Sequence, residues 1–161
     1  IVRPVQSGDA VVSSSRIREA LKSGNPQIAA KLLTRPFTIE GVVQHGAKEG
    51  RKLGFPTANL DLGNYLRPAY GIYAVRGRLA DGRVLDGAAN VGIRPSYEPP
   101  VELLEPYFFQ FSGDLYGQTI AVELHDFLRS EQKFDDLEAL KRQMAADCDE
   151  ARTRLADAPA G

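Results

Sequence analysis

Residues 71–92 read GIYAVRGRLADGRVLDGAANVG and contain two strand-like runs on either side of Asp81-Gly82. The first run contains Ile72, Tyr73 and Val75 and the second contains Val84 and Val91, which are residue types that favour pleated structure. Asp-Gly between two such runs is a strong signal for a two-residue hairpin turn. The stretch therefore predicts a pair of antiparallel strands.

Three more stretches resemble strands, and no helical segment separates them. They are FTIEGVVQ (37–44), VELLEPYFFQF (101–111) and QTIAVELHDFL (118–128), and Ser112–Gly117 joins the last two. Five or six mostly antiparallel strands predict a mainly β fold, and closure into a barrel would remove exposed edges. A sandwich fits the same periodicity.

Helical signals occur only at the two ends of the chain. Ser13, Ser14 and Ser15 offer a helix cap before RIREAL, and Gly24 would end that helix. A second short helix is expected over Pro26–Leu33, with Asn25 as its cap. After Phe134, helical spacing predicts a C-terminal helix whose apolar stripe comprises Leu137, Leu140, Met144, Cys148, Ala151 and Leu155.

Composition excludes several classes of protein. The chain has 161 residues and a formal net charge of −1, so it offers no general attraction for nucleic acid or anionic membranes. Cys148 is the single cysteine, which excludes an intrachain disulfide and a cysteine-based zinc site. No apolar run is long enough for a membrane-spanning helix, and the cytoplasm is the expected compartment.

The first chemical signal is the loop from Gly46 to Gly54, GAKEGRKLG. Its glycines allow backbone amides to approach an anion, and Lys48, Arg51 and Lys52 add positive charge. The phosphate-loop pattern GxxxxGK[ST] and the dinucleotide pattern GxGxxG are both absent. A solvated hairpin loop is the alternative interpretation.

The next residues, Phe55-Pro56-Thr57-Ala58-Asn59, place a hydroxyl and an amide two positions apart. In extended backbone both side chains would leave the same face. Such oxygen donors suit Mg²⁺ shared with substrate phosphates. In the alternative interpretation, Thr57 and Asn59 bond their own backbone in a turn.

The motifs GVVQHGAKEGRKLGFPTANL, GIYAV, GAANVGIRP, GDLYG and LRSEQKFDDLEALKRQM occur in an order that resembles the riboflavin kinase family. The resemblance is to the kinase module of bacterial bifunctional FAD synthetases and extends from about Pro36 to Glu150. It implies a six-stranded antiparallel Greek-key barrel with a C-terminal helix and a short N-terminal helical remnant. The implied activity is phosphorylation of riboflavin to FMN by Mg-ATP, without a prosthetic group.

The resemblance also implies roles for particular residues. Thr57 and Asn59 would be the metal ligands, and the nucleotide would contact Gly46, Arg51, Gly54, Pro56, Thr57 and Asn59. The family's base is a glutamate eleven residues before the tyrosine of DLYG, which corresponds to Glu105. Spacing alone does not separate Glu105 from Glu102. His45 would shape the nucleotide loop.

The expected flavin contacts are less distinctive, because each could equally be a core or surface residue. They are Arg94, Leu115, Tyr116, Phe127, Leu128, Arg129 and Phe134. The sequence departs from the family at Pro106, next to the expected base, which predicts an edge strand or a local bulge. The proline-rich stretch 96–106 is a candidate flap over the flavin.

Residues 12–18, VSSSRIR, resemble the end of the adenylyltransferase module of FAD synthetases. We therefore expect residues 1–34 to be a remnant of that module with linker helices, residues 35–157 to form the kinase domain, and residues 158–161 to be a tail. A monomer that does not convert FMN to FAD is expected.

The alternatives are a non-catalytic flavin- or nucleotide-binding barrel and an oligonucleotide-binding barrel. The second would need a basic stripe with exposed aromatic residues, whereas the charges here are mixed.

Overall fold

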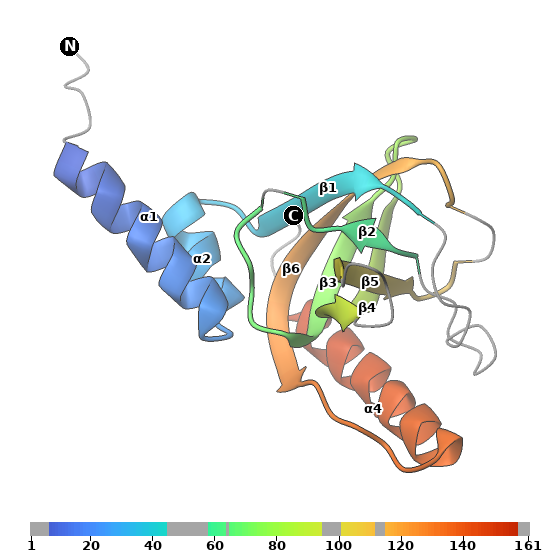
Figure 1. The fold of residues 1–161 in the computed structure, drawn as a ribbon. Coiled ribbons are helices and arrows are strands. Elements are labelled where there is room, and N and C mark those ends of the chain that lie inside the picture. Colours follow the sequence, from blue (N-terminus) through green and yellow to red (C-terminus); the bar gives the residue numbers. More distant parts are fainter. Residues whose placement is uncertain (1–6, 45–57, 64, 95–100, 112–114, 158–161) are drawn as a thin grey trace.

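The computed structural model describes residues 7–44, 58–63, 65–94, 101–111 and 115–157, with side chains described from Ser14 onward and not at Arg94. Helices α1 (Ser7–Lys22) and α2 (Pro26–Leu33) precede the strands, and helix α4 (Leu137–Ala156) follows them (Figure 1). The strands are β1 (Phe37–Val42), β2 (Leu60–Asp61), β3 (Gly71–Arg78), β4 (Val84–Arg94), β5 (Val101–Phe108) and β6 (Thr119–Ser130). The expected mainly β class is confirmed.

The strands form one sheet in the order β1-β6-β3-β4-β5-β2, and each neighbouring pair is antiparallel. Strands β3, β4 and β5 follow one another, and β6 returns to lie beside β3, which is the Greek-key arrangement. An isolated bridge between Gln44 and Asn59 brings the two ends of the sheet together. The described strands therefore form a nearly closed barrel rather than a sandwich.

The β3–β4 hairpin has a three-residue loop instead of the predicted two-residue turn. The Leu79 amide donates to the Arg83 carbonyl, so Ala80, Asp81 and Gly82 form the loop. Gly82 closes it by donating to the Leu79 carbonyl, with a φ of 94°. Glycine reaches this conformation without steric cost, which is why a type I turn followed by a left-handed residue competes with the two-residue turn.

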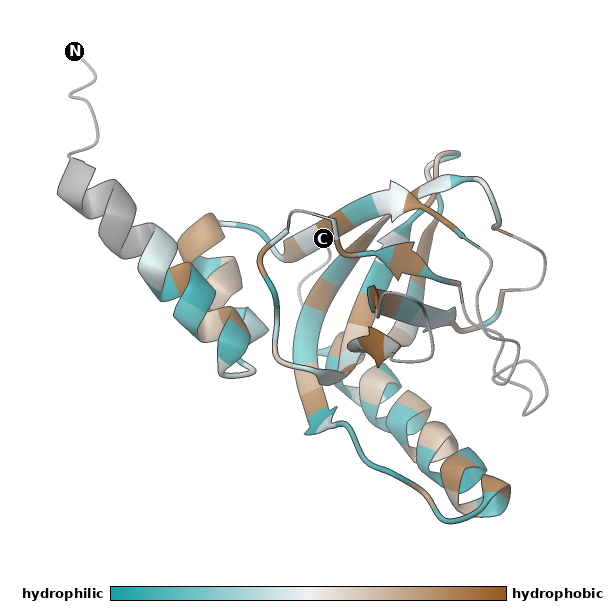
Figure 2. Cartoon of the chain, in the orientation of Figure 1, coloured by the Kyte–Doolittle hydropathy of each residue, from teal (hydrophilic) through white to brown (hydrophobic). Residues whose placement is uncertain are grey.

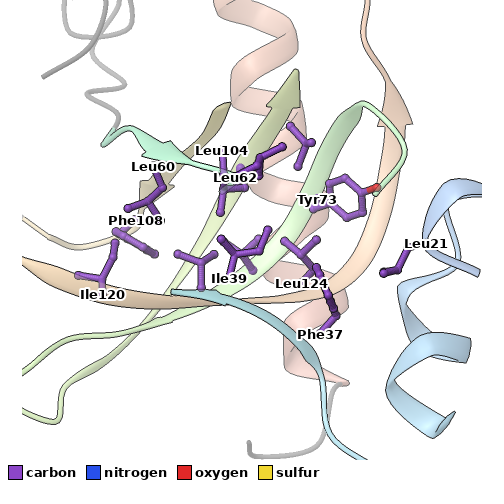
Figure 3. Close-up of a cluster of buried hydrophobic side chains, with 14 of the residues drawn as sticks. Leu21, Phe37, Ile39, Leu60, Leu62, Tyr73, Leu104, Phe108, Ile120 and Leu124 are labelled. Atoms are coloured by element: carbon purple, nitrogen blue, oxygen red, sulfur yellow. The ribbon is translucent and has the colours of Figure 1, made fainter. Parts of the chain in front are cut away.

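Alternating residues of the strands fill the barrel interior (Figure 3). The largest fully buried side chains there include Ile39, Leu60, Tyr73, Leu104, Ile120 and Leu124. Both hydrophilic and hydrophobic colours occur along β6 in Figure 2. The Tyr73 hydroxyl donates to the Ala69 carbonyl at 2.6 Å, so this buried polar atom is paired.

The terminal helices differ from expectation at three points. Helix α1 begins at Ser7, so Ser13–Ser15 lie within it and do not cap its start. Helix α2 has the expected bounds, although the Asn25 side chain makes no cap hydrogen bond. Asp136 caps α4 by accepting from the Ala139 amide at 2.7 Å. Only the C-terminal part of the predicted α4 stripe is buried, through Cys148, Ala151 and Leu155.

Candidate active site

Strand β5 separates its two glutamates onto opposite faces of the sheet. Leu104 and Phe108 point into the barrel core, whereas Tyr107 packs against the cluster formed with α4. Because side chains alternate along a strand, Glu105 shares the face of Tyr107 and Glu102 lies on the other face. We call the α4 side of the sheet the outer face. Glu105 is buried there, with 8% of its surface exposed.

Strand register places Glu105 in a row of residues at one level of the barrel. Its direct partner in β4 is Asn90, Asn90 is opposite Ile72 in β3, and Ile72 is opposite Arg129 in β6. On the other side, Leu60 pairs with Leu104, and the Ala58 amide donates to the Pro106 carbonyl at 3.0 Å. This register continues to Asn59 beside Glu105. The row therefore connects segments far apart in sequence.

Asn59 is the one predicted metal ligand that the structure describes, and only 2% of its surface is exposed. Its backbone carbonyl accepts from the Gln44 amide at 2.8 Å, which fixes the segment entering β2. The amide of Asn59 and the carboxylate of Glu105 supply hard oxygen donors, the type that Mg²⁺ prefers. Among the described residues, no group of three His, Cys, Asp or Glu could hold a metal. The donors present fit an ion shared with phosphates rather than a protein cage.

Arg129 is fixed against α4 at the far end of the row. Its Nε and Nη2 atoms each donate to Asp147 at 2.8 Å, and its Nη1 atom donates to the Ser130 carbonyl at 3.0 Å. Gln143 also donates to Asp147, at 3.0 Å. The guanidinium carbon lies 5.8 Å from the centre of the Phe134 ring. Asp147 thus joins α4 to the outer face at the level of Glu105.

Glu102, the alternative base, is held by two partners. Arg67 Nε donates to Oε1 at 2.9 Å, and the Tyr70 hydroxyl donates to Oε2 at 2.5 Å. The hydrogen bond from Tyr70 outweighs burial and, with Arg67, keeps the pKa of Glu102 below its ordinary value. The same contact raises the pKa of Tyr70 to about 12. Glu102 is therefore a carboxylate in an ion pair, away from the outer face.

Pro106 is accommodated without the predicted bulge. The register between β4 and β5 is continuous from Val101 to Phe108, and β5 lies between two strands. The amide and carbonyl of one strand residue point to the same side, and the Pro106 carbonyl faces Ala58. The missing N–H is therefore on the β2 side, where the regular ladder is only two residues long, at Leu60–Asp61. The β4–β5 ladder loses no hydrogen bond.

The other predicted site residues occupy different surroundings. Leu128 packs in the outer-face cluster, Phe134 is half-buried, and Tyr116 is exposed. Leu115 lies in the barrel core, and the Phe127 ring is 5.1 Å from that of Tyr73. Arg94 ends β4, with its side chain outside the described part. Outside the described residues lie Gly46, Arg51, Gly54, Pro56 and Thr57, together with His45 and residues 96–100 of the expected flap. Residues 101–106 of that expected flap belong instead to strand β5.

Two residues of this region were not predicted from sequence, Asn90 and Asp147. Asn90 lies within the GAANVG motif, where its neighbours along the strand are small or apolar residues. Asp147 adjoins Cys148 on the buried side of α4 and is itself buried. A polar residue within a buried pattern was the available signal in both cases.

Comparison with known proteins gives a consistent assignment. The family model of riboflavin kinase, Flavokinase, matches residues 33–155. A bifunctional riboflavin kinase/FMN adenylyltransferase of Haemophilus influenzae is 43% identical over 141 residues, covering 88% of this chain and 46% of the relative. The chain thus spans about half the length of the curated relatives it matches.

Two solved structures share the fold. One, described as a macrolide-efflux protein from Streptococcus pneumoniae, is 37% identical with a TM-score of 0.79 and covers 86% of this chain and 46% of that one. The other, riboflavin kinase from Trypanosoma brucei, is 25% identical with a TM-score of 0.55 and covers 76% and 81%. In the described part of this chain, no helix combines the length and apolarity needed to cross a membrane. The extent of the family match, together with the barrel, shows that this chain belongs to the riboflavin kinase family.

Proposed function

We propose that this chain transfers the γ-phosphate of Mg-ATP to the 5′-hydroxyl of riboflavin, forming FMN and ADP. The observation that carries the proposal is the position of Glu105, a buried carboxylate at the level of Asn59. Asn59 ends the GFPTAN segment expected to bind the nucleotide. A proton acceptor thus lies beside the segment that would present the phosphate, as phosphoryl transfer requires.

In the proposed reaction, Glu105 accepts the proton of the 5′-hydroxyl as its oxygen attacks the γ-phosphorus. The new P–O bond forms while the bond to the β–γ bridging oxygen breaks, and ADP leaves with that oxygen. The protein mainly positions these groups and stabilises developing charge. Burial of Glu105 limits its contact with water. This favours proton transfer from a bound hydroxyl over proton transfer from a water molecule.

The remaining roles rest on the resemblance of the sequence motifs to the riboflavin kinase family and on residue type. Asn59 and Thr57 would hold Mg²⁺, which neutralises phosphate charge when bound, and Gly46, Arg51, Gly54 and Pro56 would surround the phosphates. Leu128, Arg129 and Phe134 would line the flavin side, with Arg94, Leu115, Tyr116 and Phe127 as further contacts. We also propose a monomeric kinase domain at residues 35–157, preceded by linker helices, that does not bind nucleic acid.

The test measures FMN and FAD by chromatography after incubation with riboflavin, ATP and Mg²⁺. Glu105→Gln should reduce FMN formation by roughly 10²–10⁴-fold, the usual contribution of a positioned base. Glu102→Gln is the matched control on the same strand and should retain most activity. A Glu105→Gln variant as active as the wild type would refute the base assignment. A folded wild type that binds flavin without forming FMN would establish the non-catalytic barrel instead.

A further inference from the structure

Asn90 carries a buried polar atom without a hydrogen-bond partner. Its side-chain oxygen, Oδ1, is inaccessible to solvent and receives no hydrogen bond. It is the one such atom found in the described part of the chain. Buried side-chain acceptors are nearly always paired, because leaving one unpaired costs the full loss of its hydration. No described residue supplies a donor to this acceptor, which makes a bound substrate group a candidate partner.

The position of Asn90 indicates which ligand would supply that donor. Asn90 is directly opposite Glu105 in the β4–β5 ladder, so both side chains lie on the outer face. Opposite residues in an antiparallel pair have Cβ atoms about 4.5–5.5 Å apart. The Asn90 amide is therefore next to the carboxylate that we assign as the base.

The surroundings on β4 leave this oxygen without a competing protein donor. The neighbouring outer-face residues of β4 are Ala88 and Gly92, neither of which has a polar side chain. Opposite Asn90 on the β3 side is Ile72, an apolar residue. Arg129, the cation in the same row, directs Nε and Nη2 to Asp147 and Nη1 to the Ser130 carbonyl.

We propose that Asn90 binds the acceptor substrate, with Oδ1 accepting a hydrogen bond from a secondary hydroxyl of the ribityl chain. This inference rests on the proposed function. The polyol chain carries secondary hydroxyls beside the primary one that is phosphorylated, so a second acceptor adjacent to Glu105 would fix the chain's orientation. A site with a buried acceptor discriminates against a substrate that lacks the matching hydroxyl.

The experiment measures riboflavin binding by quenching of flavin fluorescence, with and without Mg-ADP, and therefore does not depend on turnover. It compares riboflavin with analogues that each lack one secondary hydroxyl, in the wild type, Asn90→Ala, Asn90→Ser and Val84→Ala. Val84→Ala is the control, an exposed position on the same strand. Far-UV circular dichroism and thermal melting establish that each variant is folded.

The wild type should bind riboflavin more tightly than the analogue that lacks one particular secondary hydroxyl, and this difference in affinity should disappear in Asn90→Ala. Removing it should weaken binding by about three- to tenfold, the range expected for one hydrogen bond. In Asn90→Ala the preference should fall below about twofold, while Val84→Ala keeps it. Asn90→Ser, which is smaller but polar, provides the same comparison if the alanine variant does not fold.

Two results would overturn the proposal. One is unchanged riboflavin affinity in a folded Asn90→Ala. The other is equal weakening for riboflavin and every deoxy analogue, which would make Asn90 a residue that merely positions Glu105. The proposed function fails separately: if the hydroxyl preference is present in the wild type and lost in Asn90→Ala but the wild type forms no FMN, the Asn90 contact stands and the kinase assignment falls.

Discussion

Glu123 in β6 is a buried carboxylate with two basic neighbours outside the candidate site. Arg78 Nε donates to Oε2 at 2.7 Å, and His125 Nε2 lies 2.9 Å from Oε1. Burial alone would raise the pKa of Glu123, but the hydrogen bonds from Arg78 and His125 outweigh it and hold the pKa below its ordinary value. Glu123 therefore favours its charged form in the folded chain.

This shift predicts how stability depends on pH. A carboxyl whose pKa is lower in the folded than in the unfolded chain stabilises the fold above its unfolded pKa, which is 4.5. That contribution disappears as the pH falls through the lower, folded value. Urea unfolding between pH 7 and pH 3 should show a steeper loss for the wild type than for Glu123→Gln. Equal slopes would contradict the prediction, and exposed Glu40→Gln should follow the wild type.

The ion pair between Arg129 and Asp147 gives a second prediction at this scale. Only 8% of the Asp147 side chain and 20% of the Arg129 side chain are exposed. Asp147→Ala would leave the guanidinium half-buried without its bidentate partner, at a cost of about 1–3 kcal/mol in unfolding free energy. Asp149→Ala is the control, because Asp149 is exposed and pairs with Arg152 on the same helix. Its expected effect is below about 0.5 kcal/mol in the same denaturant titration.

At the scale of elements, β4 and β5 approach each other closely at Gly87. A Cβ atom added there would lie 2.3 Å from the Tyr107 carbonyl oxygen, which is backbone and cannot move without disturbing the ladder. Gly87→Ala should therefore lower the unfolding free energy by about 1–3 kcal/mol, as overpacking does. At Gly41 in β1 the nearest atom would be 3.6 Å away, on Leu60. Gly41→Ala should be close to neutral, and a similar loss in both variants would contradict the contact argument.

At the scale of the whole molecule, the two N-terminal helices lie beside the barrel (Figure 1) and pack against it. Leu21 is 1% exposed within the barrel core cluster, and its carbonyl accepts from the Ala69 amide at 2.8 Å. Gln27 of α2 donates to Asp126, which also accepts from Arg154 of α4 at 2.5 Å. We expect the helices and the barrel to unfold as one unit.

Leu21→Ala tests this cooperativity. Removing a fully buried leucine side chain should lower the unfolding free energy by about 2–5 kcal/mol. Far-UV circular dichroism, dominated by helices, and tyrosine fluorescence should move to the same new midpoint. Loss of the helical signal at a lower denaturant concentration than the tyrosine signal would show that the helices detach first. Ile28→Ala, at a position 49% exposed, should leave the midpoint nearly unchanged.

The sequence by itself determined the features that depend on neighbouring residues. Alternation and turn residues predicted the β3–β4 hairpin and every strand except the two-residue β2. The proline and flanking residues predicted helix α2. The ordered motifs predicted the riboflavin kinase family, which the family model confirms. Local patterns gave the wrong prediction where the same residues allow two local conformations. This is the case at the three-residue loop after Leu79 and at the start of α1.

Only the tertiary structure decided which residues meet. No local pattern specifies that Asn59, Asn90 and Arg129 lie at the level of Glu105, because that depends on the pairing register of strands distant in sequence. Alternation along β5 separates Glu102 from Glu105, but the packing of α4 defines which face holds the candidate site. The same reason applies to Asn90. Whether its side-chain oxygen has a hydrogen-bond donor depends on residues of strands that are distant in sequence.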